Sequence, residues 1–331
     1  MHTLIEEMFR NKFTNDILDE QSDSAIIGSV PAKGNLAFTT DSYVINPIFF
    51  PGGDIGKLAI CGTINDLSVA GAKPRYMSCG FIIEEGLDFD VLEKVTDSMA
   101  ETAKDEDIGI VTGDTKVVEK GMCDKLFINT SGIGIRDTKL NFSPNRIAPG
   151  DKIIINGSIG EHGIATLIAR GDFHFDADIL SDCACLWSLI REICDFHIKV
   201  VEKGRGEPIK FMRDPTRGGL ATTLHETAQA MKPGIVINEE DIPVEEGVES
   251  ACEILGFDPL FVANEGKVVL VVSKDYVEDI LRIMKRHPLG RKTRVIGEVV
   301  KNPESTVLMK TRIGGKRIIE MIVGDQLPRI C

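Results

Sequence analysis

Three aspartates in the first half of the chain stand at the ends of apolar segments or inside them. Asp41 follows LAFTT, Asp66 lies within AICGTINDLSVAG, and Asp114 follows IGIVTG. A carboxylate among apolar residues is costly unless another group compensates its charge. Carboxylate oxygens suit Mg²⁺ better than Zn²⁺, so the three acids predict a shared magnesium ion and, with it, a nucleoside triphosphate. The alternative, in which each aspartate caps a separate helix or turn, stays open.

The second half of the chain supplies RDPTRGGLATTLHETA and the turn ANEGK. Arg217 stands at the expected start of a helix, where it could bind an anion or form a surface salt bridge. His225 follows in the same helix, and a single histidine among Thr, Leu and Glu is more often structural. Glu265 lies in a turn between two apolar stretches, as a positioned carboxylate or as an ordinary turn residue.

Two glycine-rich segments and a group of cysteines do not match the motifs that they approach. PGGDIGKL has neither the first Gly of a Walker loop nor its Ser or Thr, and GSIGEHG lacks the spacing of dinucleotide-binding loops. Cys183, Cys185 and Cys194, with His197, could be read as a metal cluster, but they lack paired zinc-site spacing. They fall in an expected amphipathic helix, which favours buried thiols.

Strand and helix patterns alternate along both halves of the chain. In the first half we expect strands in NLAFTTDSYVI, RYMSCGFII, IGIVTGDTKVV and DKLFINTSGIGIR, a buried helix within 51–71, and an amphipathic helix capped by Asp88. In the second half we expect a strand and a helix in DKIIINGSIGEHGIATLIAR, helices over 186–202 and 218–231, and strands near 234–238, 267–273 and 294–299. NFSPNRIAPGD, with its two prolines, predicts a domain boundary near 140–150. The alternation predicts an α/β or α+β fold.

Composition and charge narrow the class of protein. The 331 residues are 43% hydrophobic and 27% charged, which suits two globular domains. A net charge of −13 argues against nucleic acid or an anionic membrane as the main partner, and no apolar run approaches the ~20 residues that cross a bilayer. The eight cysteines lack a regular spacing, and the N-terminal residues lack a signal-peptide pattern. These features predict a cytoplasmic protein with reduced thiols.

Several segments, taken together, resemble one known family. They are TTDSYVINPIFFPGGDIGKLAICGTINDLSVAGAKPRYMSCGFIIEEG, IVTGDTKVVEKG, DKLFINTSGIG, RDPTRGGLATTLHE, NEGK and the final PRIC. From about residue 35 onward, the chain resembles the HypE family of hydrogenase maturation proteins. That family lies in the superfamily of aminoimidazole ribonucleotide synthetase, selenophosphate synthetase and thiamine monophosphate kinase, whose members use ATP to phosphorylate a poorly reactive oxygen or similar acceptor.

The resemblance implies an α/β (α+β) fold of two domains, like that of aminoimidazole ribonucleotide synthetase, with a flexible C-terminal tail. We expect an N-terminal segment over 1–34, an ATP-binding and dimerisation domain over 35–145 and a C-terminal α/β domain over 146–323. The tail, 324–331, would carry Cys331.

The implied reaction is the ATP-dependent dehydration of a carbamoyl group on Cys331, which yields a thiocyanate. The amide oxygen is a poor leaving group, so ATP would first convert it to a phosphate ester, and a base must remove the two amide protons. The resemblance favours Glu265 as this base. His225 would orient the group or assist proton transfer, and Lys125 would steady the developing charge.

The resemblance also implies a cleft for ATP and Mg²⁺. The expected metal ligands are the three aspartates described above, and the expected cofactor contacts are Asp41, Asp66, Asp114, Asn65, Thr115 and Arg217. Many relatives carry an Asp-Asp pair near the N-terminus, where this chain has only Asp23 in QSDSAIIG.

The resemblance names partners as well. A HypF carbamoyltransferase would load Cys331, and a HypC–HypD complex would accept the cyanide for the iron of nickel–iron hydrogenase. The protein would be a homodimer joined through its N-terminal domains. Two alternatives stay open: a kinase or synthetase that acts on a small diffusible molecule, and a scaffold that binds ATP and partners without catalysis.

Overall fold

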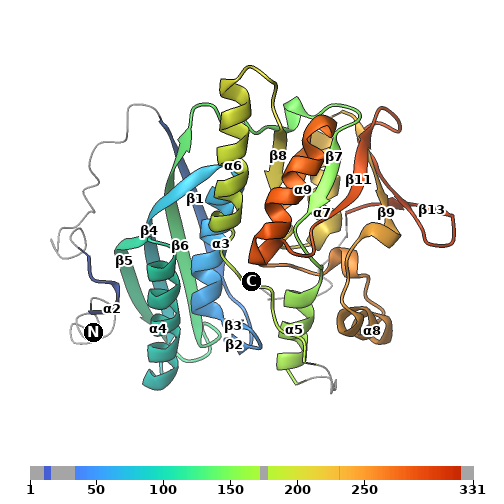
Figure 1. The fold of residues 1–331 in the computed structure, drawn as a ribbon. Helices are drawn as coiled ribbons and strands as arrows, with labels where there is room; N and C mark the ends of the chain where they lie inside the picture. The colour runs from blue at the N-terminus through green and yellow to red at the C-terminus, as the bar shows by residue number, and fades with distance from the viewer. Residues whose placement is uncertain (1–10, 16–33, 172–177, 231, 322–331) are drawn as a thin grey trace.

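In the computed structural model, which describes residues 11–15, 34–171, 178–230 and 232–321, two β-sheets lie side by side (Figure 1). Helices pack against both sheets, and this mixed architecture confirms the predicted α/β (α+β) class. No helix in these ranges is long and apolar enough to cross a lipid bilayer. The predicted tail, 324–331, lies outside them.

The first sheet has four strands in the order β1-β6-β4-β5. They are β1 (Gly34–Tyr43), β6 (Leu126–Asp137), β4 (Ala72–Glu84) and β5 (Gly109–Val118). β6 is antiparallel to both of its neighbours, whereas β4 and β5 are parallel. These are the four strands predicted for the first half of the chain.

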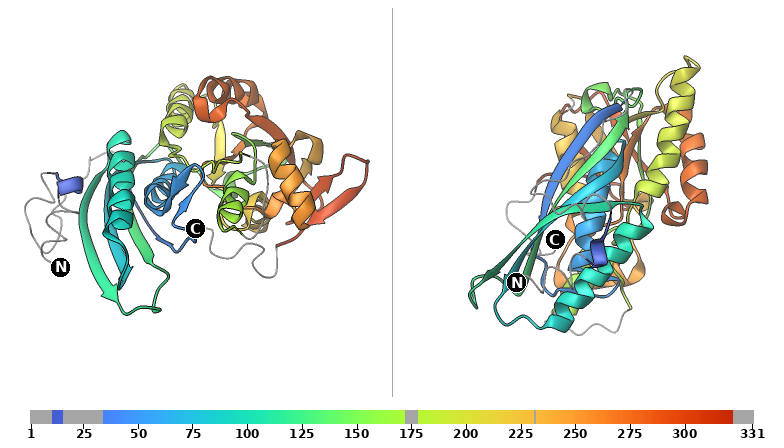
Figure 2. Two further views of the ribbon diagram at one scale, coloured as in Figure 1. Left: turned by 90° about the horizontal axis from the view of Figure 1, so that it is seen from below. Right: turned by 90° about the vertical axis from the view of Figure 1, so that its left-hand side faces the viewer.

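Helices α3 (Ile55–Val69) and α4 (Phe89–Asp105) cover one face of this sheet, and α3 lies on the side of the second sheet (Figure 2). We call the face that they cover the inner face. The Asp54 side chain caps α3 by accepting hydrogen bonds from the backbone N–H groups of Gly56 and Lys57, and Asp88 caps α4 as predicted. Residues all around α3 are buried, because the sheet and the second domain enclose it.

The opposite, outer face of the first sheet carries exposed apolar side chains. Leu36 and Phe38 of β1 are 58% and 67% exposed, and Ile82 of β4 is 42% exposed. The smaller elements of this domain lie elsewhere: α2 (Asn11–Phe13) contacts α4 and β5, and the hairpin of β2 (Phe49–Phe50) and β3 (Gly53–Asp54) precedes α3. Among the described elements, none covers the outer face.

The second sheet has seven strands in the order β13-β12-β9-β11-β7-β10-β8. In chain order they are β7 (Lys152–Ile155), β8 (Ile209–Arg213), β9 (Gly234–Asn238), β10 (Val269–Val272), β11 (Arg294–Val300), β12 (Val307–Lys310) and β13 (Lys316–Ile319). The helices of this domain are α5 (Glu161–Ala169), α6 (Trp187–Glu202), α7 (Gly219–Ala230), α8 (Glu246–Leu255) and α9 (Val277–Arg286). Strands β8, β12 and β13 and helices α8 and α9 are absent from the prediction, and all five are short.

The second sheet is buried on both faces. Ile153 and Ile155 of β7 pack into a core with Leu220 and Leu224 of α7, whereas Ile154 packs into a separate core under α6 and α9. A strand that is apolar at every position is therefore explained by cover on both sides. Loops follow and precede these buried strands. The loop after β8 and the turn before β10 reach the first domain.

Candidate active site

The inner face of β1 presents polar side chains to α3. Thr39 faces α3, because its Oγ1 donates a hydrogen bond to Asp66 Oδ2 over 2.7 Å. Side chains alternate between the two faces of a strand, so Asp41 and Tyr43 share the face of Thr39. Burial raises the pKa of the Asp66 carboxyl, and the charge of Asp41 raises it further. The fold thus places Asp41 and Asp66 beside each other.

Tyr43 places a hydroxyl group within this site. The residue is 1% exposed, and its hydroxyl packs against Gly62 of α3, where a side chain would collide with it. Burial raises the pKa of Tyr43, and the charges of Asp41 and Glu265 add to this effect.

The C-terminal domain supplies two further carboxyl groups from loops. Asp214 directly follows β8, and burial, together with the charges of Asp66 and Asp41, raises its pKa to about 7. Glu265 lies shortly before β10 and is 3% exposed, and its Oε1 has no hydrogen-bond partner among the described residues. Burial raises the pKa of Glu265 well above its usual range, and nearby anions, including Asp214 and Asp41, raise it further.

Four carboxyl groups from two domains therefore meet where the domains touch, and their like charges repel one another. Among the described residues, one cation, Arg213, lowers the pKa of both Asp66 and Asp214. No three or more metal-binding side chains of the described residues converge on one point. Mg²⁺ commonly takes one or two carboxylates and completes its shell with phosphate oxygens and water. The donor set thus fits a magnesium–nucleotide complex better than a protein-only metal centre.

Asn65, next to Asp66 on α3, joins the two domains. Its Nδ2 donates hydrogen bonds to the carbonyl oxygens of Ala184 (3.1 Å) and Glu265 (3.2 Å), and its Oδ1 accepts one from the Leu186 N–H (2.8 Å). Asn65 is 2% exposed, and backbone groups engage both polar atoms of its amide. The structure therefore gives Asn65 a role in holding the Glu265 turn, while its role as a cofactor contact stays a prediction.

Asp114 does not join the other acids. Strand pairing connects Asp114 to Gly80 of β4, then to Asn129 of β6, and finally to Ser42 of β1. Asp41, the neighbour of Ser42, pairs instead with Thr130 and so faces the other side of the sheet. Asp114 therefore lies on the outer face, three strands from Asp41, where it is exposed and bonded to Lys116 over 3.0 Å. Within one chain, strand alternation therefore turns Asp114 away from Asp41 and Asp66, and its role as a metal ligand stays a prediction.

Two other predicted residues of the first domain are also apart from the acids. Thr115 follows Asp114 on β5 and pairs with Phe81 on the inner face. Lys125 stands before β6 in a left-handed conformation (φ 66°), and its N–H donates to Glu84 Oε2 over 2.9 Å. Because a strand rises about 3.4 Å per residue, Lys125, just before β6, lies roughly 17 Å along the strand direction from Thr130, the partner of Asp41. Within one chain, Lys125 is thus distant from the acids.

Arg217 and His225 belong to the loop after β8 and to the following helix. Arg217 is exposed, three residues after Asp214. His225 is half-buried in α7, and its Nδ1 has no hydrogen-bond partner among the described residues. Their predicted roles as an anion contact and in proton transfer stay predictions.

The cysteines confirm the interpretation as buried thiols, but the expected helix begins after the first two of them. Cys183 and Cys185 are buried in the segment before α6, and Cys194 is buried within α6; all three are free. The Cys185 Sγ lies 3.2 Å from the Cys61 Sγ of α3. His197 accepts a hydrogen bond at Nδ1 from the Ile209 N–H (3.2 Å), which gives the ring a structural role.

Two predicted residues, Cys331 and Asp23, lie outside the described residues. In turn, sequence reasoning named neither Asp214 nor Tyr43 as a site residue. Asp214 carries the same signal as Asp41, an acid at the end of a strand, but β8 was not predicted. Tyr43 could have been found from its position two residues after Asp41 on one strand.

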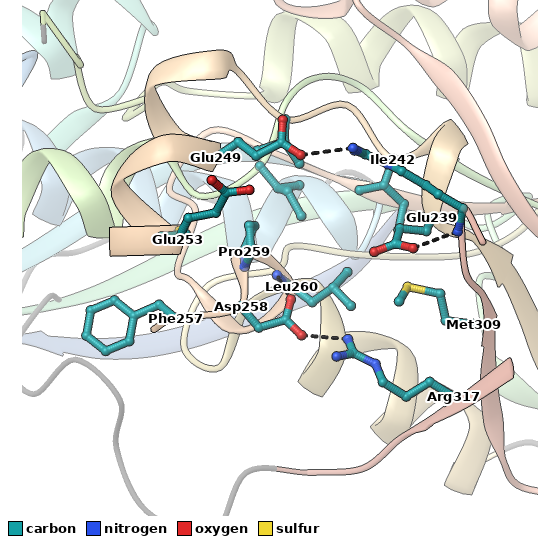
Figure 3. Close-up of a pocket in the computed structure, with 14 residues that line it drawn as sticks. Glu239, Ile242, Glu249, Glu253, Phe257, Asp258, Pro259, Leu260, Met309 and Arg317 are labelled. Atoms are coloured by element: carbon teal, nitrogen blue, oxygen red, sulfur yellow. Dashed lines mark hydrogen bonds and ion pairs between the residues drawn. The ribbon is translucent and has the colours of Figure 1, made fainter. Parts of the chain in front are cut away.

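A separate pocket lies beside α8 in the C-terminal domain (Figure 3). It has a volume of about 330 Å³, and apolar residues such as Leu260 and Met309 line it. Its arginines are paired with acids at its edge: Arg312 Nη1 lies 3.0 Å from Glu249, and Arg317 also pairs with an acid. None of the acids at the domain junction lines this pocket, so it is distinct from the candidate site.

Comparisons with known proteins identify the class first. Residues 21–136 match the family model of the AIR synthase related protein N-terminal domain, and residues 148–310 match that of its C-terminal domain. The chain is thus an AIR synthase related protein with both of the domains of that class.

Relatives that match over the full length of the chain identify one family within this class. The chain is 47% identical over 331 residues to the carbamoyl dehydratase HypE of Rhizobium leguminosarum bv. viciae, covering 100% of this chain and 92% of that protein. It is 45% identical over 334 residues to the carbamoyl dehydratase HypE of Escherichia coli (strain K12), covering 100% and 96%. The chain therefore belongs to the HypE family of hydrogenase maturation proteins.

Solved structures agree with this assignment. The crystal structure of E. coli HypE matches with a TM-score of 0.93 at 45% identity and covers 100% of both chains. A structure of HypE in complex with ATP matches with a TM-score of 0.91 at 45% identity, covering 100% of this chain and 96% of that one. A HypE–HypF complex matches with a TM-score of 0.82 at 47% identity, covering 96% and 99%.

Proposed function

We propose that this chain catalyses the ATP-dependent dehydration of a carbamoyl group on the sulfur of Cys331 and so forms a thiocyanate. The names of its relatives support the reaction, and one structural observation carries the proposal. The buried Glu265 carboxyl, beside Asp41 and Asp214, has an oxygen without a partner among the described residues. A buried polar atom without a partner is costly, and a substrate amide that enters the site would account for it.

ATP is proposed to bind with Mg²⁺ at the acids of the domain junction. Asp41 and Asp66 would bind the metal together with phosphate oxygens and water, Asp214 would lie beside it, and Arg217 remains a candidate contact for the phosphates. The structure of a relative in complex with ATP supports nucleotide binding. When bound, the magnesium nucleotide supplies the phosphoryl group and neutralises charge that develops on it. Asp114, predicted as a third ligand, lies on the outer face and gains no support.

The atoms of the proposed reaction balance without a further reactant. The γ-phosphoryl group of ATP moves to the carbamoyl oxygen, the C–O bond breaks, and the oxygen leaves within inorganic phosphate. The two N–H protons must also leave, and Glu265 is the proposed base. Because a carboxylate holds one proton at a time, Glu265 would accept each in turn, and the protons would end on the departing phosphate and in solvent. The products are the thiocyanate, ADP and phosphate.

The electrostatics of the site link this base to the cofactor. Burial raises the pKa of Glu265, and nearby anions, Asp214 and Asp41 among them, raise it further, so the free site favours the protonated carboxylic acid. Neutralisation of Asp41 and Asp214 would remove this repulsion and lower the pKa of Glu265. The base would then become available when nucleotide and metal are in place.

The proposed partners follow the family. HypF would supply the carbamoyl group, which the HypE–HypF complex of a relative supports, and a HypC–HypD complex would accept the cyanide for nickel–iron hydrogenase. We also propose a homodimer in which two outer faces cover each other. The exposed apolar side chains of Leu36, Phe38 and Ile82 support this, because no described element covers the face that carries them.

Intact-mass spectrometry tests the reaction. The chain, carbamoylated by HypF, is mixed with Mg-ATP, and Cys331 should lose the mass of one water. Glu265→Gln should keep the carbamoyl mass, and Cys331→Ala should accept no carbamoyl group while it remains folded. If the wild-type protein hydrolyses ATP and yet keeps the carbamoyl mass, the proposed chemistry is wrong.

A further inference from the structure

A buried lysine with two acidic partners lies directly behind the Glu265 turn. The Lys267 Nζ is 2.9 Å from Asp182 Oδ2 and 2.8 Å from Glu161 Oε2. The side chains of Lys267 and Asp182 are 9% and 3% exposed, and that of Glu161 is 18% exposed. Because a buried charge without a partner is strongly unfavourable, Lys267 favours the ionised form of Asp182. The Lys267 charge accordingly lowers the pKa of Asp182 against the opposing effect of burial.

The ionised Asp182 accepts hydrogen bonds from the backbone of the Glu265 turn. Its Oδ1 accepts a hydrogen bond from the Glu265 N–H, and its Oδ2 accepts one from the Gly266 N–H, both over 3.1 Å. Hydrogen bonds from backbone N–H groups to a carboxylate are stronger than those between neutral groups. Gly266 lies so close to the Asp182 carbonyl that a side chain there would collide with it.

The other side of the same turn is held from the first domain. The Glu265 carbonyl oxygen accepts the hydrogen bond from Asn65 of α3. Both hydrogen-bonding groups of the Glu265 backbone are therefore engaged, the N–H by Asp182 and the C=O by Asn65. The side chain, by contrast, has an oxygen without a partner among the described residues. The backbone hydrogen bonds hold the Glu265 carboxyl group in one position, and its unpartnered oxygen is left available to bind a substrate.

We propose that Asp182 is a positioning residue for Glu265, and that Lys267 in turn holds Asp182 in place. The inference rests on the proposed function, in which Glu265 is the base. A base must stand within hydrogen-bond reach of the proton that it removes, and a displacement of about 1 Å can lower a rate about 100-fold. Asp182 would act through the backbone of Glu265 and would not touch the substrate.

The chain offers a matched control. Asp182 and Glu161 both pair with Lys267, but of these two acids only Asp182 accepts hydrogen bonds from the backbone of the Glu265 turn. Asp182→Asn removes a charge and one acceptor from the turn, whereas Glu161→Gln removes a charge from the same lysine and leaves the turn unchanged. A purely structural ion pair predicts similar effects of the two changes. A positioning role predicts that only Asp182→Asn slows the chemistry.

The experiment measures single turnovers of the carbamoylated full-length chain with Mg-ATP. Asp182→Asn should lower the rate constant of water loss about 100-fold at saturating ATP, with a half-saturating ATP concentration changed less than about 3-fold. Glu161→Gln should change both quantities less than about 3-fold. An Asp182→Asn rate within about 3-fold of wild type, or equal losses in the two variants, overturns the proposal.

A double variant separates positioning from general damage. If Asp182 acts through Glu265, Asp182→Asn should add no further loss in the Glu265→Gln background, because the group that it positions is already gone. A further loss of about 100-fold there would overturn the proposal. If Asp182→Asn does not fold, Asp182→Glu replaces it as the test. This variant keeps the negative charge beside Lys267 but displaces the carboxylate by one methylene group, so it should also slow the reaction. An unchanged rate would overturn the proposal.

The same measurements distinguish this inference from the proposed function. A Glu265→Gln variant that dehydrates at the wild-type rate removes Glu265 as the base and overturns both. A slow Glu265→Gln variant beside a fast Asp182→Asn variant overturns the positioning role alone.

Discussion

Asn65→Ala should destabilise the protein even without nucleotide, because the structure uses this side chain to join the domains. The change removes three hydrogen bonds: those to the carbonyl oxygens of Ala184 and Glu265, and the one from the Leu186 N–H. A buried group that loses its partner costs about 1–3 kcal/mol. The Glu265 oxygen keeps a longer contact of 3.4 Å with the Ala184 N–H, so a total of about 3–5 kcal/mol is expected.

Urea unfolding of the nucleotide-free protein measures this loss. Asn145→Ala is the matched control, since Asn145 is exposed and such a change should stay within about 0.5 kcal/mol of wild type. A second comparison, Asn65→Asp, keeps the acceptor for Leu186 but places a buried negative charge against two carbonyl oxygens. It should therefore destabilise the protein about as much as the alanine variant does.

One result would refute the reasoning. If Asn65→Ala unfolds at the same urea concentration as Asn145→Ala but binds ATP much more weakly, Asn65 is a cofactor contact and not an interdomain one. A destabilised variant with unchanged affinity for ATP in its folded form would favour the interdomain role.

The remaining predictions concern packing, pH and assembly. Burial lowers the pKa of His197 to about 4, below its unfolded value of about 6.5, so the contribution of His197 to stability should fall by about 2 kcal/mol from pH 7 to pH 5. In urea titrations the stability of wild type relative to His197→Gln should therefore decrease by about 2 kcal/mol over this range, and an unchanged difference would contradict the assignment. Gly62→Ala should lower the free energy of unfolding by about 1–3 kcal/mol through its collision with the Tyr43 hydroxyl, and Tyr43→Phe should recover part of the loss; no recovery would place the strain elsewhere. Phe38→Glu should shift a dimer to monomer in sedimentation velocity without unfolding, and an unchanged sedimentation coefficient would exclude the outer face as the interface.

Local sequence patterns were sufficient for much of the first domain. The four strands, the buried α3 and the capped α4 were predicted, because alternation, helical periodicity and the Asp88 cap are local signals. The acid Asp66 inside an apolar helix was also visible as an unusual residue. The second domain was predicted less completely: the four-residue strands β12 and β13 were missed, and so were α8 and α9, although both helices carry an apolar and a polar face.

The sequence alone also identified the residues that have the chemistry, but not which of them meet. Asp41 and Asp114 carry the same signal, an acid after an apolar strand, yet they lie on opposite faces of one sheet. Strand pairing decides the face, because a shift of one residue turns every side chain over. The local pattern does not contain that register.

Only the tertiary structure decided that the two domains build one site. Asn65 and Glu265 are 200 residues apart in the chain and are joined by a hydrogen bond, and Asp214 and Asp182 reach the junction from loops. The raised pKa of Glu265 has the same origin, since burial and acids from both domains produce it together. Interdomain packing supplies this environment, and no local segment of the sequence encodes it.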